Sequence, residues 1–77
     1  MNREYSKQSA KFLDSQNEDV YSRITSAISK LPKGDVKKLK GTKNKYRLRV
    51  GDFRIIFAKT GNFIFIENID NRGQVYK

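Results

Sequence analysis

The chain has 77 residues, and 17 Lys and Arg against 8 Asp and Glu give it a net charge of +9, with no cysteine and no histidine. Chains this short fold around one small core, so we expect residues 1–77 to form a single domain. The missing Cys and His side chains exclude disulfides, thiolate metal sites and Ser–His or Cys–His nucleophile pairs, and we expect neither a metal nor a cofactor.

The N-terminal stretch predicts a short strand followed by a helix. Residues 2–5 fit an edge strand, and Ser6 is a candidate N-cap for a helix through residues 7–16. The residues expected to face inward on this helix are Ala10, Phe12 and Leu13. The N-terminus has no apolar run like that of a signal peptide, and no stretch of the chain approaches membrane-spanning length, so we expect a cytoplasmic protein.

A second helix is predicted immediately afterwards. Asn17, Glu18 and Asp19 form a start signal, because acidic residues suit a helix N-terminus, and Pro32–Gly34 stop the helix. Five apolar residues recur at helical spacing between these points: Val20, Ile24, Ala27, Ile28 and Leu31. The two helices therefore form a hairpin with one apolar stripe.

The positive charge is concentrated in one segment of the chain. Residues 30–54 contain ten basic and two acidic side chains, which is a net +8 out of the total of +9. Such a concentration is typical of a protein that binds a polyanion, and nucleic acid is the commonest polyanion in a cell. For residues 33–43 alone, a solvated lysine-rich loop without a partner is an equally good interpretation.

After the lysine-rich loop, the apolar period changes from 3.6 to 2 residues. Apolar and basic side chains alternate over residues 45–50, as in a strand with one buried face. Gly51–Asp52 reverses the chain, residues 53–59 form the next strand, and after a turn at residues 60–62, residues 63–69 form a third, more apolar strand that we expect to lie centrally. The aromatic residues assigned mostly to the core are Tyr46, Phe53, Phe57, Phe63 and Phe65.

These elements predict an α+β fold in which the helical hairpin covers one face of an antiparallel meander. Arg47 and Arg49 project to the face opposite their apolar neighbours, and Arg54 on the adjacent strand joins them. Three guanidinium groups at neighbouring positions repel one another, which indicates that they gather an anion. For any one of them, an ordinary exposed basic face is the alternative.

The sequence YRLRVGDFRIIF, preceded by KKLKG and followed by NRGQVY, resembles the RelE/ParE superfamily of toxins from bacterial toxin–antitoxin pairs. The resemblance covers nearly the whole chain. It implies a helical hairpin packed on one face of a mainly antiparallel sheet of three to four strands. One branch of the superfamily cleaves messenger RNA on the ribosome, and another inhibits DNA gyrase.

The resemblance to the RNA-cleaving branch implies a set of catalytic residues. These are Arg47, Arg49, Arg54, Arg72 and Tyr76. It also implies a metal-independent endoribonuclease in which the ribose 2′-hydroxyl attacks the adjacent phosphodiester and leaves a 2′,3′-cyclic phosphate, while the arginines stabilise the charge of the pentacoordinate state. The best-known enzyme of this branch has lysines at the positions of Arg47 and Arg49.

Several residues are candidates for the general base that accepts the proton of the 2′-hydroxyl. Tyr76 is the first candidate, and stacking on a splayed base or packing on the sheet edge are its other roles. Glu67 and Asp70 are fallback bases, although Glu67 is better interpreted as the partner of a neighbouring cation. Asn71 stands where relatives often carry histidine, which keeps a non-catalytic RNA-binding relative as an alternative.

The resemblance further implies a cognate antitoxin and a ribosomal partner. An acidic, partly disordered antitoxin suits the basic segment. The residues expected to contact ribosomal RNA phosphates are Lys33, Lys37, Lys38, Lys40, Lys43 and Lys45. A gyrase inhibitor of the ParE kind is the other alternative, and the pair of Arg72 and Tyr76 counts against it.

Overall fold

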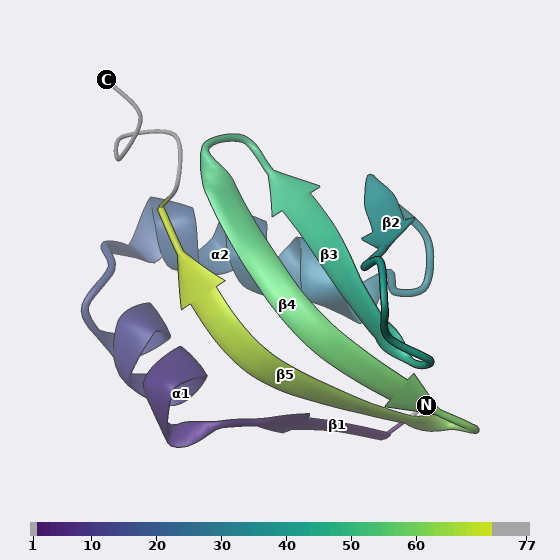
Figure 1. Cartoon of the computed structure of the whole chain (residues 1–77). Coiled ribbons are helices and arrows are strands. Elements are labelled where there is room, and N and C mark those ends of the chain that lie inside the picture. Colours follow the sequence, from purple (N-terminus) through teal and green to yellow (C-terminus); the bar gives the residue numbers. More distant parts are fainter. Residues whose placement is uncertain (1, 72–77) are drawn as a thin grey trace.

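Residues 2–71, which the computed structural model describes, form two helices and a five-stranded sheet (Figure 1). In chain order the elements are β1 (Asn2–Tyr5), α1 (Lys7–Asp14), α2 (Glu18–Ser29), β2 (Val36–Lys38), β3 (Lys45–Val50), β4 (Phe53–Thr60) and β5 (Phe63–Asp70). The short first strand, the helical hairpin and the three consecutive strands are all confirmed, and β2 is an additional strand.

The sheet has the strand order β1-β5-β4-β3-β2, with the expected antiparallel meander of β3, β4 and β5 at its centre. β2 pairs antiparallel with β3, but β1 pairs in parallel with β5, so the sheet is mixed and has five strands instead of three to four. The pattern analysis missed β2 because only Val36 is apolar among its three residues, which are too few to show an alternation.

Both helices begin where the sequence places their start. Ser6 Oγ accepts a hydrogen bond from Ser9 N at 3.1 Å, and Asn17 Oδ1 accepts one from Val20 N at 2.9 Å. Each cap satisfies a backbone N–H that has no partner inside its helix. The first helix ends at Asp14, two residues earlier than expected. Neither of the two helices in the described part of the chain is long and apolar enough to cross a membrane.

The inward face of α1 differs from the expectation. Ala10 is exposed, and Ser9 is fully buried instead, one helical turn before the buried Leu13. Ser9 Oγ donates a hydrogen bond to Ile66 O of β5 at 3.1 Å. The prediction for Ala10 is wrong because the small Ser9 side chain takes the inward position, where its hydroxyl is satisfied by the strand and lets the helix approach closely.

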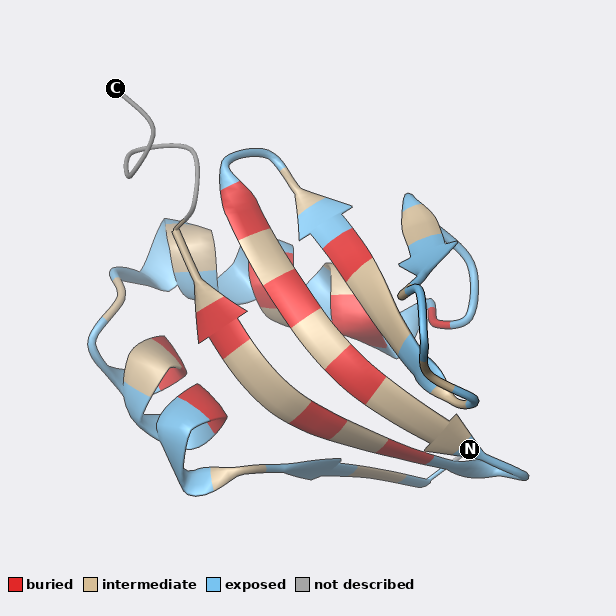
Figure 2. Cartoon of the chain, viewed as in Figure 1, coloured by how far each residue is buried: buried red, intermediate tan, exposed pale blue. Residues whose placement is uncertain are grey.

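The residues of β4 alternate between the two faces of the sheet (Figure 2). Phe53, Ile55 and Phe57 are buried against the helices. The Tyr46 ring stacks on Phe57 with centroids 5.4 Å apart, and Phe12 of α1 packs edge-on against Phe53 at 5.9 Å. The core assignment of Tyr46, Phe53 and Phe57 is therefore confirmed.

The fifth strand carries apolar residues on both of its faces. Ile64 and Ile66 are fully buried, whereas Phe63 and Phe65 occupy the alternate positions. Phe63 is 39% exposed and Phe65 is half-buried, so the core assignment of Phe63 is wrong. In a strand with apolar residues at successive positions, the sequence pattern does not show which set faces the helices.

A β-bulge in β5 changes this alternation. Ile66 and Asn68 pair with consecutive residues of β4, which leaves Glu67 as an extra residue in β5. Ile69, three residues after Ile66, is consequently buried on the same side as Ile66. The bulge therefore lets both ends of β5 contribute to one core.

Candidate functional site

Both helices pack against one face of the sheet (Figure 1). The opposite face, here called the open face, carries the predicted arginines. Cross-strand partners share a face of a sheet. Arg47 of β3 pairs with Ile56 of β4, and the next pair on this face joins Arg49 to Arg54. Arg54 is in turn the register partner of Asp70 in β5. The structure thus brings Arg47, Arg49 and Arg54 onto adjacent positions of two neighbouring strands.

Asp35, immediately before β2, balances part of this positive charge. One carboxylate oxygen lies 3.8 Å from Arg47 Nη2, and the other lies 4.0 Å from Arg49 Nε. The backbone of Asp35 also accepts a hydrogen bond from Arg49 N at 3.0 Å. The Arg47 side chain is only 15% exposed, whereas that of Arg49 is 61% exposed. Asp35 therefore holds two arginines of different accessibility together.

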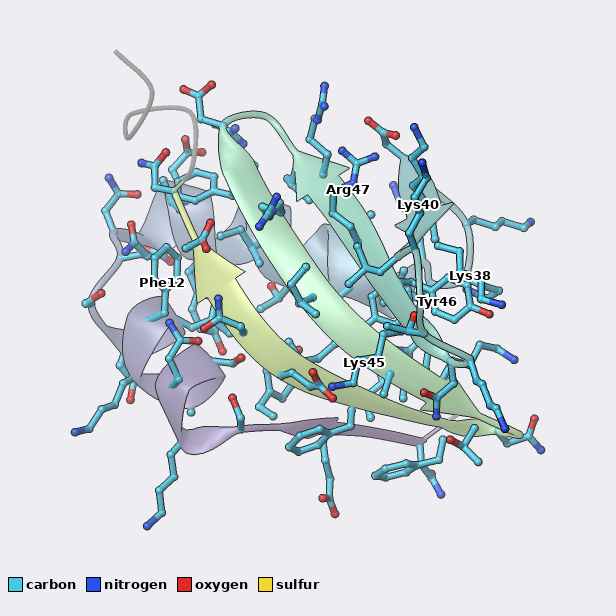
Figure 3. All side chains as sticks on the ribbon, viewed as in Figure 1. Phe12, Lys38, Lys40, Lys45, Tyr46 and Arg47 are labelled. Carbon is cyan, nitrogen blue, oxygen red and sulfur yellow. The ribbon has the colours of Figure 1, made fainter. Side chains whose placement is uncertain are left out.

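Lys45 and Glu67 form a second ion pair on this side of the sheet. Lys45 Nζ lies 3.3 Å from Glu67 Oε1, and Figure 3 shows Lys45 reaching from β3 toward β5. The β-bulge at Glu67 is what allows this side chain to meet a lysine two strands away. The interpretation of Glu67 as the partner of a neighbouring cation is therefore confirmed.

Arg54 lies on the central strand β4, near the β3–β4 turn, and is half-buried. Its Nε is buried and has no hydrogen-bond partner within residues 2–71. The Oδ1 atom of Asn71, next to the end of β5, is also buried and also has no hydrogen-bond partner within residues 2–71. A buried donor without an acceptor is costly, which makes Arg54 Nε well suited to donate to an oxyanion that enters from the open face.

The six predicted lysines do not form one surface. Lys37 is the register partner of Arg47 and shares the open face, whereas Lys38 pairs with Tyr46 and belongs to the other face. Lys33, Lys40 and Lys43 lie on loops and are exposed. Of the six, only Lys37 and Lys45 therefore extend the arginine cluster directly.

Two of the predicted site residues, Arg72 and Tyr76, lie outside the described residues. Asp70, one of the two fallback bases, is half-buried beside Arg54 in the register, and Glu67 is paired with Lys45. Within residues 2–71, no group of three Asp, Glu, His or Cys side chains comes close enough together to hold a metal ion. The described part of the site is therefore a set of cations with carboxylate partners.

Tyr5, at the end of β1, is in a different environment from the arginines. Burial raises the pKa of Tyr5 above its ordinary value of 10.0, the neighbouring Tyr21 raises it further, and Arg3 acts in the opposite direction. Both tyrosines line a small hollow with Leu13 beside the two helices. Tyr5 is the register partner of Ile66, which is buried on the helix side of the sheet, so this phenol is not part of the open face.

Sequence reasoning overlooked Asp35 as a member of the site. Its only signal was an acidic residue within a basic segment. The pairing of Val36 with Leu48 places Asp35 next to Arg49, but this register depends on β2, which the pattern did not predict. The mutual repulsion expected among the arginines is consequently smaller than their charges alone suggest.

No family model matches the chain. Among curated proteins, it is similar to Toxin RelE3 of Methanocaldococcus jannaschii, with 41% identity over 42 residues. The match spans 54% of this chain and 48% of the relative, so it covers about half the length of that protein.

Two solved structures are similar over almost the whole chain. The RelB–RelE antitoxin–toxin complex from Methanococcus jannaschii has a TM-score of 0.75 and 29% identity, and the alignment covers 94% of this chain and 93% of that one. The archaeal RelE–RelB complex from Pyrococcus horikoshii OT3 has a TM-score of 0.77 and 30% identity, with 95% and 96% covered. The similarity therefore extends over nearly the whole length of each chain.

Proposed function

This chain belongs to the RelE family of toxins, and we propose that it is a metal-independent endoribonuclease that cleaves messenger RNA on the ribosome. The observation that carries the proposal is the placement of Arg47, Arg49 and Arg54 at adjacent positions of the open face. A cluster of this kind binds phosphate and stabilises extra negative charge on it. The buried Nε atom of Arg54, which has no hydrogen-bond partner within residues 2–71, supports the same proposal because it is a donor available to a phosphate oxygen.

The proposed reaction needs charge stabilisation more than a strong nucleophile. The 2′-oxygen forms a bond to phosphorus, the bond to the 5′-oxygen breaks, and the products are a 2′,3′-cyclic phosphate and a 5′-hydroxyl. Arg47, Arg54 and Arg72 would donate to the pentacoordinate phosphate between these steps. Removing one such donor costs about 2.7–4 kcal/mol of activation free energy. Arginine stays protonated up to about pH 12, so these residues bind charge and do not accept the proton.

Proton transfer is assigned to Tyr76, which lies outside the described residues. Its phenol would either accept the proton of the 2′-hydroxyl or stack on a base beside the scissile bond. Asp70 is the second candidate because it is the register partner of Arg54. Lys37 and Lys45 would contact RNA phosphates at the margin of the open face. Lys38 at the end of β2 and the loop lysines Lys33, Lys40 and Lys43 would contact ribosomal RNA.

A cognate antitoxin is the second partner in this proposal. The two similar solved structures are complexes of a RelE toxin with RelB. For this chain we expect an acidic and partly disordered antitoxin that neutralises residues 30–54 and keeps the enzyme inactive in the cytoplasm.

The proposal is tested by primer extension on a reporter messenger RNA in a purified translation system, with and without ribosomes. We expect the wild-type protein to cut only translated RNA. Arg54→Ala should lose cutting, and Lys11→Ala, an exposed change on α1, should retain it. Loss of cutting in Tyr76→Phe would favour proton transfer over stacking. Absence of wild-type cuts under all conditions would refute the enzyme, and a supercoiling assay would then test for gyrase inhibition.

A further inference from the structure

A second basic surface lies on the other side of β3 from the open face. A groove of ≈ 500 Å³ runs between α2 and the end of β3, and we call it the α2–β3 groove. Its cationic side chains come from the helix, the loop that follows it and the strand. They are Arg23, Lys30, Lys33 and Arg49. Only Lys33 and Arg49 belong to the residues for which the sequence predicts RNA contacts.

The groove has an excess of positive charge. Its acidic side chains are Asp19 and Asp35, and Asp35 already pairs with arginines of the open face. Arg23, Lys30 and Lys33 have no carboxylate partner among the residues that the structure describes. Three cations without a partner around one depression attract an anion from outside the described chain.

Arg23 connects the groove to the open face. Its Nη2 atom lies 2.8 Å from the position that a Cβ on Gly51 would occupy, so the guanidinium covers the turn between β3 and β4. The register pair of Arg49 and Arg54 lies on the two strands beside this turn. Arg49 lines the groove as well as belonging to the open face. A polyanion bound to the arginine cluster can therefore continue around the end of β3 into the groove.

The lining of the groove suits phosphate better than a peptide. Its apolar floor consists of Ala27, Leu48 and Val50, of which Leu48 is only 1% exposed. The groove has no aromatic lining residue among the described residues, and tight protein contacts usually depend on a large apolar or aromatic anchor in a pocket. Cationic side chains are sufficient to bind backbone phosphates, and such contacts do not depend on the identity of the bases.

We propose that the α2–β3 groove binds one backbone phosphate of the messenger RNA, next to the scissile phosphodiester on the open face, with Arg23 as the principal contact. The inference rests on the proposed function because it extends the path of the same RNA strand. The contact is independent of sequence, and it fixes the position of the strand relative to Arg54 without taking part in the chemistry.

The test is a double-mutant cycle between Arg23→Ala and single neutral linkages in a synthetic messenger RNA bound to ribosomes. Each neutral linkage is a methylphosphonate that replaces one phosphate. The nucleotide before it carries a 2′-O-methyl group, because a free 2′-hydroxyl would attack the linkage, and the scissile phosphate is left unchanged. We expect Arg23→Ala, and neutralisation of one flanking phosphate, each to raise KM about 5-fold with kcat unchanged. With both changes the total rise in KM should still be about 5-fold, instead of the about 25-fold expected for independent effects, because both changes remove the same contact.

Two control variants and three possible outcomes decide the proposal. Lys11→Ala on α1 should show no coupling to any linkage, and Arg23→Lys should restore part of the affinity. If Arg23→Ala weakens ribosome binding without coupling to any messenger RNA phosphate, the groove contacts ribosomal RNA and the proposal is refuted. If Arg23→Ala has no effect while Arg54→Ala abolishes cutting, the groove proposal fails and the enzyme remains. A wild-type protein that cuts no unmodified RNA refutes both.

Discussion

Ile55 and Ile56 are neighbours in β4, but they lie in two different regions of the molecule. Ile55 is fully buried among apolar side chains under the helices, whereas Ile56 is half-buried on the open face as the register partner of Arg47. One region excludes water from a small core, and the other gathers guanidinium groups and carboxylates on the opposite side of the same strands. Because side chains alternate along a strand, stability and the proposed RNA cleavage should be separable by substitutions at adjacent positions.

The largest effect on stability is expected from Ile55→Ala. Truncating a fully buried isoleucine removes apolar contacts and leaves a cavity, which costs about 2–5 kcal/mol of unfolding free energy. Ile56→Ala is the matched control, since it removes the same atoms from a half-buried site, and we expect less than half of that loss. Urea denaturation followed by circular dichroism measures both. Equal losses in the two variants would mean that the open face contributes as much to the unfolding free energy as the buried face, which would contradict the comparison.

Arg47→Ala should produce the converse result. We expect the activation free energy of RNA cleavage to rise by about 2.7–4 kcal/mol because one donor to the phosphate is lost. The unfolding free energy should change less than in Ile55→Ala, because the ion pair with the exposed Asp35 contributes about 0–1 kcal/mol and only the aliphatic part of the Arg47 side chain is otherwise lost. Single-turnover cleavage and urea denaturation are measured on the same preparation. Arg47→Lys should recover only part of the activity, because the forked guanidinium geometry is absent.

A smaller effect is expected from Asp35→Asn. The substitution removes the carboxylate from between Arg47 and Arg49 and leaves more positive charge on the open face. We expect binding of a non-cleavable RNA to tighten about 2- to 5-fold at low salt, and the gain to fade as salt screens it. Fluorescence anisotropy over a salt series is the measurement. Asp14→Asn on α1 makes the same charge change and should leave binding nearly unaltered; equal gains would exclude a specific role for Asp35.

The smallest effect concerns pH and the corner of the molecule that contains Tyr5. Because burial raises its pKa above 10.0, the neutral phenol is favoured in the folded state. The stability that this contributes is present below about pH 10 and is lost as the pH rises through the raised folded pKa. The stability difference between wild type and Tyr5→Phe should therefore shift against the wild type between about pH 9 and about pH 11. Parallel stability curves across this range would contradict the shift.

Local patterns predicted the local features of this fold. The caps at Ser6 and Asn17 act within three residues of chain, and the alternation over residues 45–50 reports which side of one strand is apolar. Both were readable because the interacting groups are close in sequence. The same alternation placed Arg47 and Arg49 on one face, where the structure has them.

Features that depend on distant pairing could not be predicted in this way. The contact of Asp35 with Arg47 and Arg49 requires the register of β2 on β3, and the Glu67 bulge requires that of β5 on β4. From the sequence, Arg23 is an ordinary exposed residue of α2, and only the tertiary structure shows that it lies beside the hairpin turn at Gly51. These contacts arise from tertiary structure, and no short window of sequence contains both partners.

The parallel pairing of β1 with β5 has a consequence for the order in which the chain can fold. Asn2 of β1 is the register partner of Phe63 of β5, so β1 can pair only after β5 has been synthesised. Helix α1 depends on the same strand through the bond from Ser9 to Ile66. Such non-local contacts are formed late and at a high cost in loop-closure entropy. A nascent chain therefore cannot complete its sheet before synthesis has passed β5.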